Sequence, residues 1–552
     1  MMLTFVLIII IVAISLNYFN QNVLESARPL LSHTSASPSS SLSAQASNIS
    51  SIDFAIQNPN NLSLSIDIYW KRISIILLIC TLPLLWEGRA YEDLYLYNGL
   101  LLINSKLNLV VWLLVIIGSI LITTLVQNNI TQEVSRERIV FTLCAILGGI
   151  ILNSATDFLT ILLGLELQSY SVYILAASYR NYEPSEAAGL KYFLLGALSS
   201  ALVFMGLAIL YAYSGSTNLD HAFLMISLNQ NDIILPYAGT ILILAGISWK
   251  VAAAPLQAWS IDVYDAVPTR TTAVLSLLPK IALFSLLIRL ISLITTNNLD
   301  FVNNSLSNYI NLYVEVSVQI IIVIIALSLI IGSVAGLFQP RIKRLLAYSS
   351  VLNVGFILMG ALLSNSTLDY YNPTLYIIQY IITTAAIWLC LINLSNKNNL
   401  SDITLISQLQ GIHSDPSTSR TLNVKDKSAQ LYYTFIAICL TALVLSTAGI
   451  PPMVGFYAKY SVIILALQSG YTTLALIAVL ASIISTVYYL GVIKAIWSKS
   501  SKDKYNKDLY ISAMNNVKPS NQYESTLIIS FLTLIVVLYL LQYSVVYVIL
   551  SL

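Results

Sequence analysis

The segment LSTAGIPPMVGFYAKY, residues 445–460, places two glycines and two adjacent prolines inside a long apolar run. Proline removes a backbone donor and clashes with the preceding helical turn, so this segment predicts a broken helix. Lys459 follows the break within the same apolar run. A charge at the centre of a membrane helix costs about 2.5–3.5 kcal/mol. A break followed by a buried lysine therefore indicates a functional element.

The composition of the whole chain requires lipid as its solvent. Of 552 residues, 57% are hydrophobic and 9% are charged, whereas soluble domains have about 25% charged residues. In lipid every backbone polar group needs an internal partner, which leaves helices or closed barrels. The apolar runs approach the ~20 residues of a spanning helix and do not alternate with period two. We therefore expect an all-α polytopic membrane protein, and the net charge of +2 argues against a nucleic-acid partner.

Hydropathy predicts fourteen transmembrane helices. The apolar run Met1–Leu16 lacks the basic start and the cleavage chemistry of a signal peptide, so we expect a retained first helix. Polar segments at 20–70, 395–430 and 498–523 interrupt the series, and no separate soluble domain is expected. The expected spans are 3–18, 72–88, 108–127, 138–153, 156–178, 187–213, 234–254, 270–293, 316–337, 344–364, 373–394, 430–466, 471–497 and 524–551.

The distribution of basic residues supports this number of helices. Lysine and arginine gather in loops on the cytoplasmic or matrix side of a membrane. Of the 27 Lys and Arg residues, 19 fall in odd-numbered loops, two (Arg89 and Lys106) fall in even-numbered loops, and six lie within the helices. A miscounted helix would exchange the later loops and blur this asymmetry. Both termini are therefore expected on the less basic side.

Four charged residues lie well inside the expected helices. Glu166 is the only carboxylate far from a helix end, and Lys250, Lys280 and Lys459 lie in three later helices. Burial disfavours the charged form of lysine and a nearby carboxylate favours it, so a lysine whose partner approaches or recedes can exchange a proton. Water between Ser, Thr and Tyr side chains would carry that proton. The alternative is a static ion pair, but one carboxylate cannot neutralise three lysines.

Three further cations lie nearer to helix ends. Lys191 stands near the start of its helix, and from there it could either extend to the membrane surface or take part in a buried site. Arg289 and Lys494 are expected to extend to the surface, because a long side chain near a helix end can keep its charge in water.

A second broken helix is expected where Pro255 follows Lys250. Paired interruptions in two halves of a chain point to inverted repeats with sites near the membrane midplane. The two broken helices, the seventh and the twelfth, lie five helices apart. We therefore expect two inverted five-helix repeats, helices 4–8 and 9–13. The expected organisation is 1–137 for the N-terminal helices with a Ser/Asn-rich loop, 138–293 and 316–497 for the repeats, and 498–552 for a polar loop and the last helix.

The sequence contains no pattern for a bound cofactor or metal. No glycine-rich nucleotide loop opens a helix after a strand. His33, His221 and His413 all lie in expected loops. The cysteines stand singly in apolar runs and are interpreted as core residues: Cys80, Cys144, Cys390 and Cys439. Any linked redox chemistry is expected on another subunit.

Six segments follow one another as in the antiporter-like subunits of respiratory complex I, which this chain resembles over about 138–497. The segments are GLELQSYSVYIL (164–175), EAAGLKYFLLGALSSA (186–201), WKVAAAPLQAWSIDVYDAVPT (249–269), SLLPKIALF (276–284), KRLLAYSSVLNVGFIL (343–358) and LSTAGIPPMVGFYAKY (445–460). The resemblance implies the fold of that family. It also implies a proton-translocating membrane subunit that is coupled to quinone reduction elsewhere in the complex.

The resemblance implies roles for single residues. Glu166 matches the family glutamate that pairs with the lysine of the first broken helix, here Lys250. Lys280 matches the central lysine that bridges two half-channels, and Lys459 matches the lysine near the exit side. Lys191 matches the lysine of a KYF motif, and the resemblance places it on the proton path with Glu166, Lys250, Lys280 and Lys459.

One residue departs from the family pattern. Relatives usually have a histidine after the proline of the first broken helix, and this chain has Gln257. A glutamine can orient water but cannot titrate, so a histidine relay step is not implied for this chain.

The resemblance also implies partners and location. NADH, FMN, iron–sulfur clusters and ubiquinone would be bound by other subunits, and no cofactor by this one. The partners would be other membrane-arm subunits and lipid, with cardiolipin as a candidate, and protons would be the only small-molecule substrate. The chain is similar to mitochondrially encoded fungal members, which implies the inner membrane with both termini in the intermembrane space.

Two other functions stay open. One is a subunit of a cation/proton antiporter or membrane-bound hydrogenase, and the other is a non-pumping scaffold subunit. The element DVYDAVPT (262–269) favours complex I over the first of these.

Overall fold

The computed structural model describes residues 71–83, 94–125, 135–179, 182–228, 234–296, 308–364, 371–395, 402–410, 424–498 and 523–538. Nearly all of these residues are helical, as expected for an all-α membrane protein. The expected first helix, 3–18, lies outside the described residues, as do most of the polar segments 20–70, 395–430 and 498–523.

Every expected span from 72–88 onward contains a helix. The helices are a helix over 71–83, α4 (Ser105–Leu125), α5 (Ser135–Ser154), α6 (Phe158–Ala177), α7 (Glu183–Ser214), α8 (Leu219–Leu228), α9 (Ile234–Val251), α10 (Ala258–Ala266), α11 (Thr269–Thr296), α12 (Asn308–Leu337), α13 (Ile342–Leu363), α14 (Tyr371–Ser395), α15 (Val424–Ala448), α16 (Val454–Gln468), α17 (Thr472–Trp497) and α19 (Tyr523–Leu538). A 3-10 turn, η3 (Ile406–Leu409), lies between α14 and α15.

Five short elements were not expected from hydropathy: the helices α8 and α10, the turn η3 and two strands. α8 has 10 residues, too few to cross a membrane. Strands β1 (Leu94–Leu96) and β2 (Leu101–Ile103) pair antiparallel, with Leu94 opposite Ile103. Such short elements leave no signal in a hydropathy window as long as a membrane span.

Nine helices in the described part of the chain are long and apolar enough to cross a membrane. Shorter apolar helices accompany them, and α9 and α16 are short because the two predicted breaks interrupt their spans. α7 illustrates how sequence sets the ends of a span. It has a proline in its first turn and ends at Gly215, which adopts φ 67°, the arrangement that fits the steric preferences of both residues.

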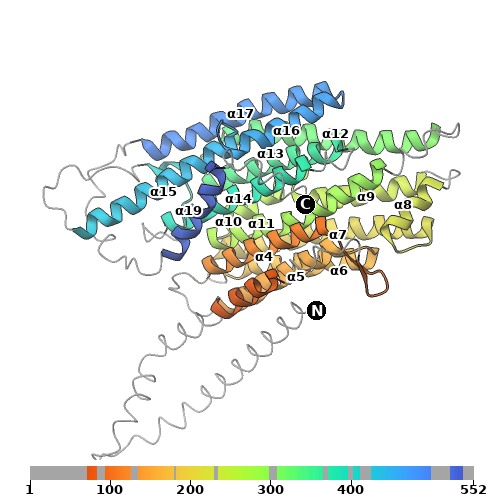
Figure 1. Cartoon of the computed structure of the whole chain (residues 1–552), viewed down its shortest axis with the longest axis horizontal. Helices are drawn as coiled ribbons and strands as arrows, with labels where there is room; N and C mark the ends of the chain where they lie inside the picture. The colour runs from red at the N-terminus through yellow and green to blue at the C-terminus, as the bar shows by residue number, and fades with distance from the viewer. Residues whose placement is uncertain are drawn as a thin grey trace, which may run out of the picture.

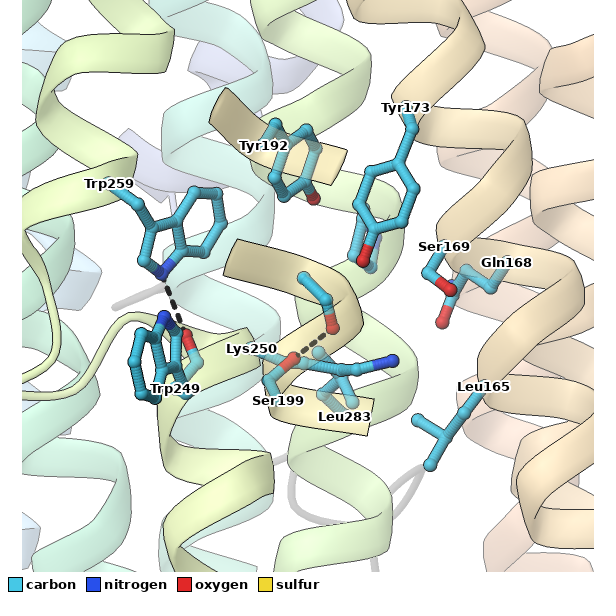
Figure 2. A pocket seen from close by; sticks show the side chains of 12 residues that line it. Leu165, Gln168, Ser169, Tyr173, Tyr192, Ser199, Trp249, Lys250, Trp259 and Leu283 are labelled. Atoms are coloured by element: carbon cyan, nitrogen blue, oxygen red, sulfur yellow. Dashed lines mark hydrogen bonds between the residues drawn. The ribbon is translucent and has the colours of Figure 1, made fainter. Parts of the chain in front are cut away.

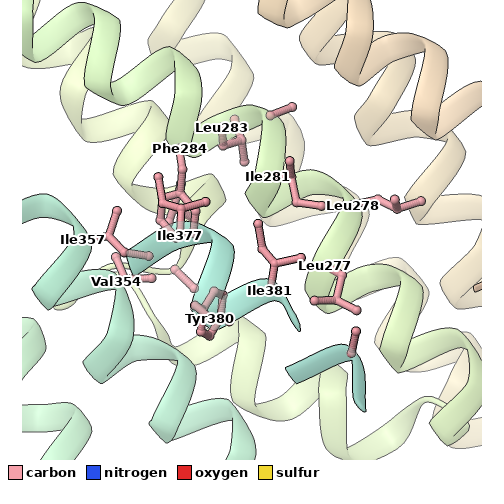
Figure 3. Packing of buried hydrophobic residues seen from close by; sticks show 14 of the residues in the cluster. Leu277, Leu278, Ile281, Leu283, Phe284, Val354, Ile357, Ile377, Tyr380 and Ile381 are labelled. Atoms are coloured by element: carbon pink, nitrogen blue, oxygen red, sulfur yellow. The ribbon is translucent and has the colours of Figure 1, made fainter. Parts of the chain in front are cut away.

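The helices form two groups that meet along α11 and α14 (Figure 1). α5 packs on α6 and α7 packs on α9 in one group, while α12 packs on α13 and α17 in the other. α11 contacts helices of both groups, including α4, α5, α13 and α14. Figure 3 shows Leu277, Ile281 and Phe284 of α11 facing Val354 of α13 and Ile381 of α14 in this shared core.

The two broken helices close with the same backbone hydrogen bond. After α9, the N–H of Ala253 donates to the carbonyl of Ser248 at 2.9 Å, and after α15, the N–H of Ile450 donates to Leu445 at 3.2 Å. Each bond joins a residue to the one five positions earlier, as in the Schellman closure of a helix. The prediction of a break in each of these spans is confirmed.

Each closing turn contains a residue in the left-handed region, where φ is 65° at Ala252 and 83° at Gly449. Glycine adopts this region without penalty, whereas the Cβ of an alanine costs about 1–2 kcal/mol. Pro255 and Pro452 follow these residues at the same separation, and a new helix, α10 or α16, begins after each. The match at the two breaks agrees with the expected repeats. The repeat boundaries 138–293 and 316–497 stay predictions.

Equivalent helix pairs also pack through equivalent glycines. A Cβ on Gly148 of α5 would lie 2.6 Å from the backbone nitrogen of Gln168 in α6. A Cβ on Gly332 of α12 would likewise lie 2.6 Å from the backbone nitrogen of Leu352 in α13. Only glycine permits the two backbones to approach this closely.

We expect Gly332→Ala to lower the thermal stability of the purified protein, because the added methyl overlaps a neighbouring backbone at a cost of about 1–3 kcal/mol. The matched control is Gly491→Ala in α17, where nothing lies within 4 Å of the added Cβ. Thermal unfolding in detergent measures both. Equal melting temperatures for the two variants would show that the α12–α13 contact is not close in solution.

Candidate functional site

Lys459 binds two carbonyl groups that the second break leaves open. Its Nζ donates to Thr447 O at 2.8 Å and to Ala448 O at 3.0 Å. In an unbroken helix these carbonyls would accept from the residues four positions later, which are Pro451 and Pro452 and have no N–H. The proline pair thus creates the acceptors, and the lysine satisfies them.

The surroundings of Lys459 favour a cation while excluding water. The residue is 6% exposed. The two carbonyls end α15, where the helix dipole is negative. The Nζ atom also lies 5.7 Å from the ring centroid of Phe356 in α13, within the range of a cation–π contact.

Glu166 of α6 and Lys250 of α9 face each other, with Lys250 Nζ 4.0 Å from Glu166 Oε1. The side chains are 21% and 7% exposed, respectively. A separation of 4.0 Å is an ion pair but too long for a hydrogen bond. Lys250 Nζ makes no hydrogen bond within the described residues, so a small movement can strengthen or release the pair.

A small cavity lies beside Lys250, and Figure 2 shows the lysine reaching from α9 toward α6 between Ser169 and Leu165. The space available to the centre of a water molecule is about 20 Å³, enough for one water. Polar groups of three helices line it: Ser169, Tyr173, Tyr192, Ser199 and Lys250. The cavity therefore offers a water molecule several hydrogen-bond partners next to the ion pair.

Two tryptophans line the cavity, and one of them donates a hydrogen bond to a backbone carbonyl at the first break. The indole N–H of Trp259 donates to Trp249 O at 2.8 Å, a carbonyl near the end of α9. The Trp259 ring stacks on Tyr192 with a centroid distance of 4.7 Å. The indole N–H of Trp249 is buried and has no partner within the described chain.

Lys280 lies at the centre of α11 and is 2% exposed. Its Nζ makes no hydrogen bond within the described residues. The Nζ atom also lies 5.8 Å from the centroid of the Tyr264 ring, within the range of a cation–π contact. Because a buried ammonium without partners is costly, this position favours loss of the proton or the presence of water.

Lys191 belongs to a separate ion pair that the sequence did not reveal. Its ammonium contacts Asp262 of α10, and both side chains are 45% exposed. Lys191 therefore neither stands alone at the surface nor joins the Glu166–Lys250 pair. Asp262 follows the first break directly, and its DVYD motif could have signalled a second acidic partner.

Arg289, near the end of α11, has specific partners at the ends of other helices. It donates to Ala155 O at 2.6 Å, in the turn between α5 and α6. It also pairs with Asp220 of α8 at 3.2 Å. The unexpected helix α8 thus supplies its acidic partner. Lys494 is exposed near the end of α17, in agreement with its expected place.

Further ion pairs fasten the ends of the helices that carry the site. Lys343 of α13 is 2% exposed and donates to Asp402 at 2.7 Å. Asp265 of α10 accepts from Arg341 at 2.5 Å and from Arg344 at 2.9 Å. From hydropathy these cations are expected in a loop, and their acidic partners leave no local signal because they are distant in sequence.

Gln257 begins α10, and its Oε1 atom is buried without a hydrogen-bond partner within the described residues. No group of three or more His, Cys, Asp or Glu residues that could hold a metal occurs among the described residues. Of the histidines, only His221 lies in the described part of the chain.

A family described as the transmembrane part of NADH:quinone oxidoreductase and Mrp antiporters matches residues 155–485. The chain belongs to this family. The matched range covers both breaks and the residues Glu166, Lys250, Lys280 and Lys459.

Curated relatives in this family are complex I subunits. NADH-ubiquinone oxidoreductase chain 2 of Rhizopus oryzae is 31% identical over 86% of this chain and 92% of its own length. NADH-quinone oxidoreductase subunit N of Paramagnetospirillum magneticum is 30% identical over 79% and 83%, and subunit N 1 of Rhizobium meliloti is 33% identical over 76% and 79%. The expected resemblance to the antiporter-like subunits of complex I is confirmed.

Solved structures of the family have the same fold. A chain of respiratory complex I from Thermus thermophilus aligns with a TM-score of 0.62 and 22% identity, covering 86% of this chain and 95% of that one. A chain of an archaeal membrane-bound sulfane sulfur reductase gives 0.65 and 19%, covering 84% and 90%. A chain of the Mrp complex from Dietzia gives 0.62 and 18%, covering 81% and 77%.

The two tryptophans provide a test of how this family member satisfies its first break. Trp259→Phe removes one of the two donors to Trp249 O and leaves the N–H of Ala252, at 3.0 Å, as the other. We therefore expect a loss of about 0.5–1.5 kcal/mol, the net contribution of one hydrogen bond. Trp249→Phe is the matched control, because the N–H that it removes has no partner within the described residues. Thermal unfolding of the purified protein measures both, and an equal loss in the two variants would contradict the assignment.

Proposed function

We propose that this chain is a membrane-arm subunit of proton-translocating NADH:ubiquinone oxidoreductase in the mitochondrial inner membrane. Its similarity to the Rhizopus oryzae chain 2, which extends over 92% of that protein, supports the assignment. The described helices account for an integral membrane subunit. The enzyme to which the chain contributes oxidises NADH and reduces ubiquinone, and this chain supplies a proton route.

We propose that the proton route uses Glu166, Lys250, Lys280 and Lys459. The observation that carries the proposal is Lys280, a buried ammonium-bearing side chain on the central helix with no hydrogen-bond partner in the described chain. A group that is so costly to charge is suited to exchanging a proton rather than to forming a static contact.

The mechanism follows from the spacing of the charges. When Lys250 and Glu166 approach more closely than the observed 4.0 Å, the ammonium form of Lys250 is stabilised, and when they move further apart, the neutral amine is favoured. Quinone reduction elsewhere in the complex would move this pair. A proton would then pass from the Lys250 side to Lys280 and on to the Lys459 amine, whose ammonium form donates hydrogen bonds to two carbonyls.

Lys191 has a supporting role in this proposal. Its pair with Asp262 joins α7 to α10, and the adjacent residue Tyr192 stacks on Trp259 at the cavity wall. The pair would therefore hold the wall of the cavity beside Lys250 rather than exchange the transported proton.

We also propose the wider setting. Flavin, iron–sulfur clusters and ubiquinone would be bound by other subunits, and other membrane-arm subunits and lipid, with cardiolipin as a candidate, would surround this chain. Both termini would face the intermembrane space. The units 138–293 and 316–497 would each contribute one half of the proton route.

A second candidate function is a subunit of an antiporter or of another membrane-bound respiratory complex. The fold likeness to chains of the Dietzia Mrp complex and of the archaeal sulfane sulfur reductase supports it. Purification decides between them: we expect the chain to co-purify with flavin and iron–sulfur subunits. Isolation as a lone, active cation/proton antiporter would overturn the complex I assignment.

Lys250→Met, Lys280→Met and Lys459→Met should each reduce the number of protons moved per NADH oxidised. A positioned acid–base group typically contributes about 10²–10⁴-fold to a proton-transfer step, so the route through this chain should effectively close. The measurement uses the intact complex in sealed vesicles, with NADH oxidation and vesicle acidification recorded together.

Lys494→Met is the matched control, because this lysine is exposed near the end of α17. It should leave the proton-to-NADH ratio unchanged. Assembled Lys280→Met and Lys250→Met complexes that pump normally would instead favour a scaffold function.

A further inference from the structure

The proposed route contains a gap between Lys280 on α11 and Lys459 on α16. No aspartate, glutamate or histidine occupies α13 (Ile342–Leu363), the helix that packs against both α11 and α16. Helix α13 nevertheless carries Ser349, Ser350 and Asn353 in its buried middle. Residues three and four apart share a helix face, so these polar groups form a stripe inside the protein.

α14 presents hydroxyl groups to this stripe. Tyr376 and Tyr380 lie four residues apart and are 1% and 2% exposed. The Tyr376 hydroxyl donates to Asn353 Oδ1 at 2.9 Å, and the Tyr380 hydroxyl lies near Ser350. Tyr380 is also close enough to Tyr264, beside Lys280, and to Tyr489 for their hydroxyls to interact electrostatically.

α17 extends the series of hydroxyls to Lys459. The Tyr489 hydroxyl lies close to Ser349, Tyr488 and Thr447, yet it is buried and makes no well-formed hydrogen bond within the described residues. The neighbouring Tyr488 hydroxyl is likewise buried and has no hydrogen-bond partner within the described residues. Thr447 also contacts Lys459, because its backbone carbonyl accepts a hydrogen bond from the ammonium group. The series of hydroxyls therefore reaches the residue that binds Lys459.

The donors and acceptors in this series have a definite arrangement. Ser349, Ser350 and Thr447 donate their own protons to carbonyls one turn earlier in their helices, at 2.7, 2.7 and 2.9 Å. They therefore present lone pairs to the tyrosines, which supply O–H donors. Buried hydroxyls left unpaired beside such acceptors are the usual partners of internal water.

We propose that a ladder of neutral hydroxyls, formed by Tyr264, Tyr380, Ser350, Tyr489 and Thr447 with the water they hold, carries the proton from Lys280 to Lys459. The inference rests on the proposed function and adds the connecting residues. Lys280 gives up one proton as its ammonium becomes an amine, and the Lys459 amine gains one, so a single positive charge changes place. The hydroxyls are neutral before and after the transfer.

A ladder without acids or bases has a physical advantage in this core. A carboxylate or imidazole between the lysines would hold the charge part-way, whereas a hydroxyl accepts and donates without retaining a proton at neutral pH. The proton would then rest only at the two lysines. The cation–π contacts of Lys280 with Tyr264 and of Lys459 with Phe356 stabilise the charge at these two ends.

The test is the double variant Tyr380→Phe/Tyr489→Phe in the intact complex in sealed vesicles. It removes two oxygens and keeps both rings. Tyr432→Phe is the matched control, since the Tyr432 hydroxyl is also buried and has no partner within the described residues but lies about 22 Å from Thr447 along α15. We expect the double variant to lower the proton-to-NADH ratio to that of Lys280→Met, and Tyr432→Phe to match the wild type.

The outcomes separate the ladder from the proposed function. A normal ratio in the double variant, together with a lowered ratio in Lys280→Met, would overturn the ladder alone. A normal ratio in Lys280→Met would overturn the proposed function and the ladder with it.

If the double variant does not assemble, a second pair of variants tests the ladder. Ser350→Ala removes one oxygen of the ladder, and Ser333→Ala removes a serine hydroxyl with the same bond to its own helix, in α12. The ladder predicts a lowered ratio for Ser350→Ala only. Equal, normal ratios for both would overturn it.

Discussion

A broken helix inside a membrane leaves backbone carbonyls that only the protein itself can satisfy, and the architecture of this site depends on how that is done. At the first break the Trp259 indole donates to Trp249 O. At the second, Lys459 donates to two carbonyls whose ordinary donors are replaced by prolines. A backbone requirement therefore fixes the position of a side chain that is also suited to proton exchange. The same contact therefore stabilises the second break and positions Lys459 for its proposed role in proton exchange.

The central helix α11 places a different demand on the fold. Its apolar side chains join the two groups of helices in one core, with Phe284 and Ile281 against α13 and α14 (Figure 3). Lys280 lies in this tightly packed region without a hydrogen-bond partner among the described residues. Close packing excludes bulk water, so protonation of Lys280 responds to the few groups that reach it. The buried hydroxyls of α13, α14 and α17 are the polar groups that connect this core to Lys459.

The short helix α10 is held from two sides by charge. Asp262 pairs with Lys191 of α7, and Asp265 pairs with Arg341 and Arg344 of α13. Because the first break removes the continuous hydrogen bonds between α9 and α10, these ion pairs orient α10 instead. α10 in turn carries Trp259 at the cavity wall and Tyr264 beside Lys280. The charges at its surface thereby control the geometry of two buried sites.

Composition and hydropathy alone determined that this is a helical membrane protein, where its spans lie and which two of them are broken, because lipid imposes a simple rule on length and polarity. The four buried charges were identifiable from the sequence for the same reason. Apart from the Glu166–Lys250 pair, only the tertiary structure decided the partners of the charged residues in these helices. Helix packing brings Asp262 to Lys191, Asp220 to Arg289 and two carbonyls to Lys459. Sequence spacing does not encode this packing. The series of hydroxyls was not predicted from the sequence, since serine and tyrosine are common in such helices. These residues become informative only when neighbouring helices bring them together.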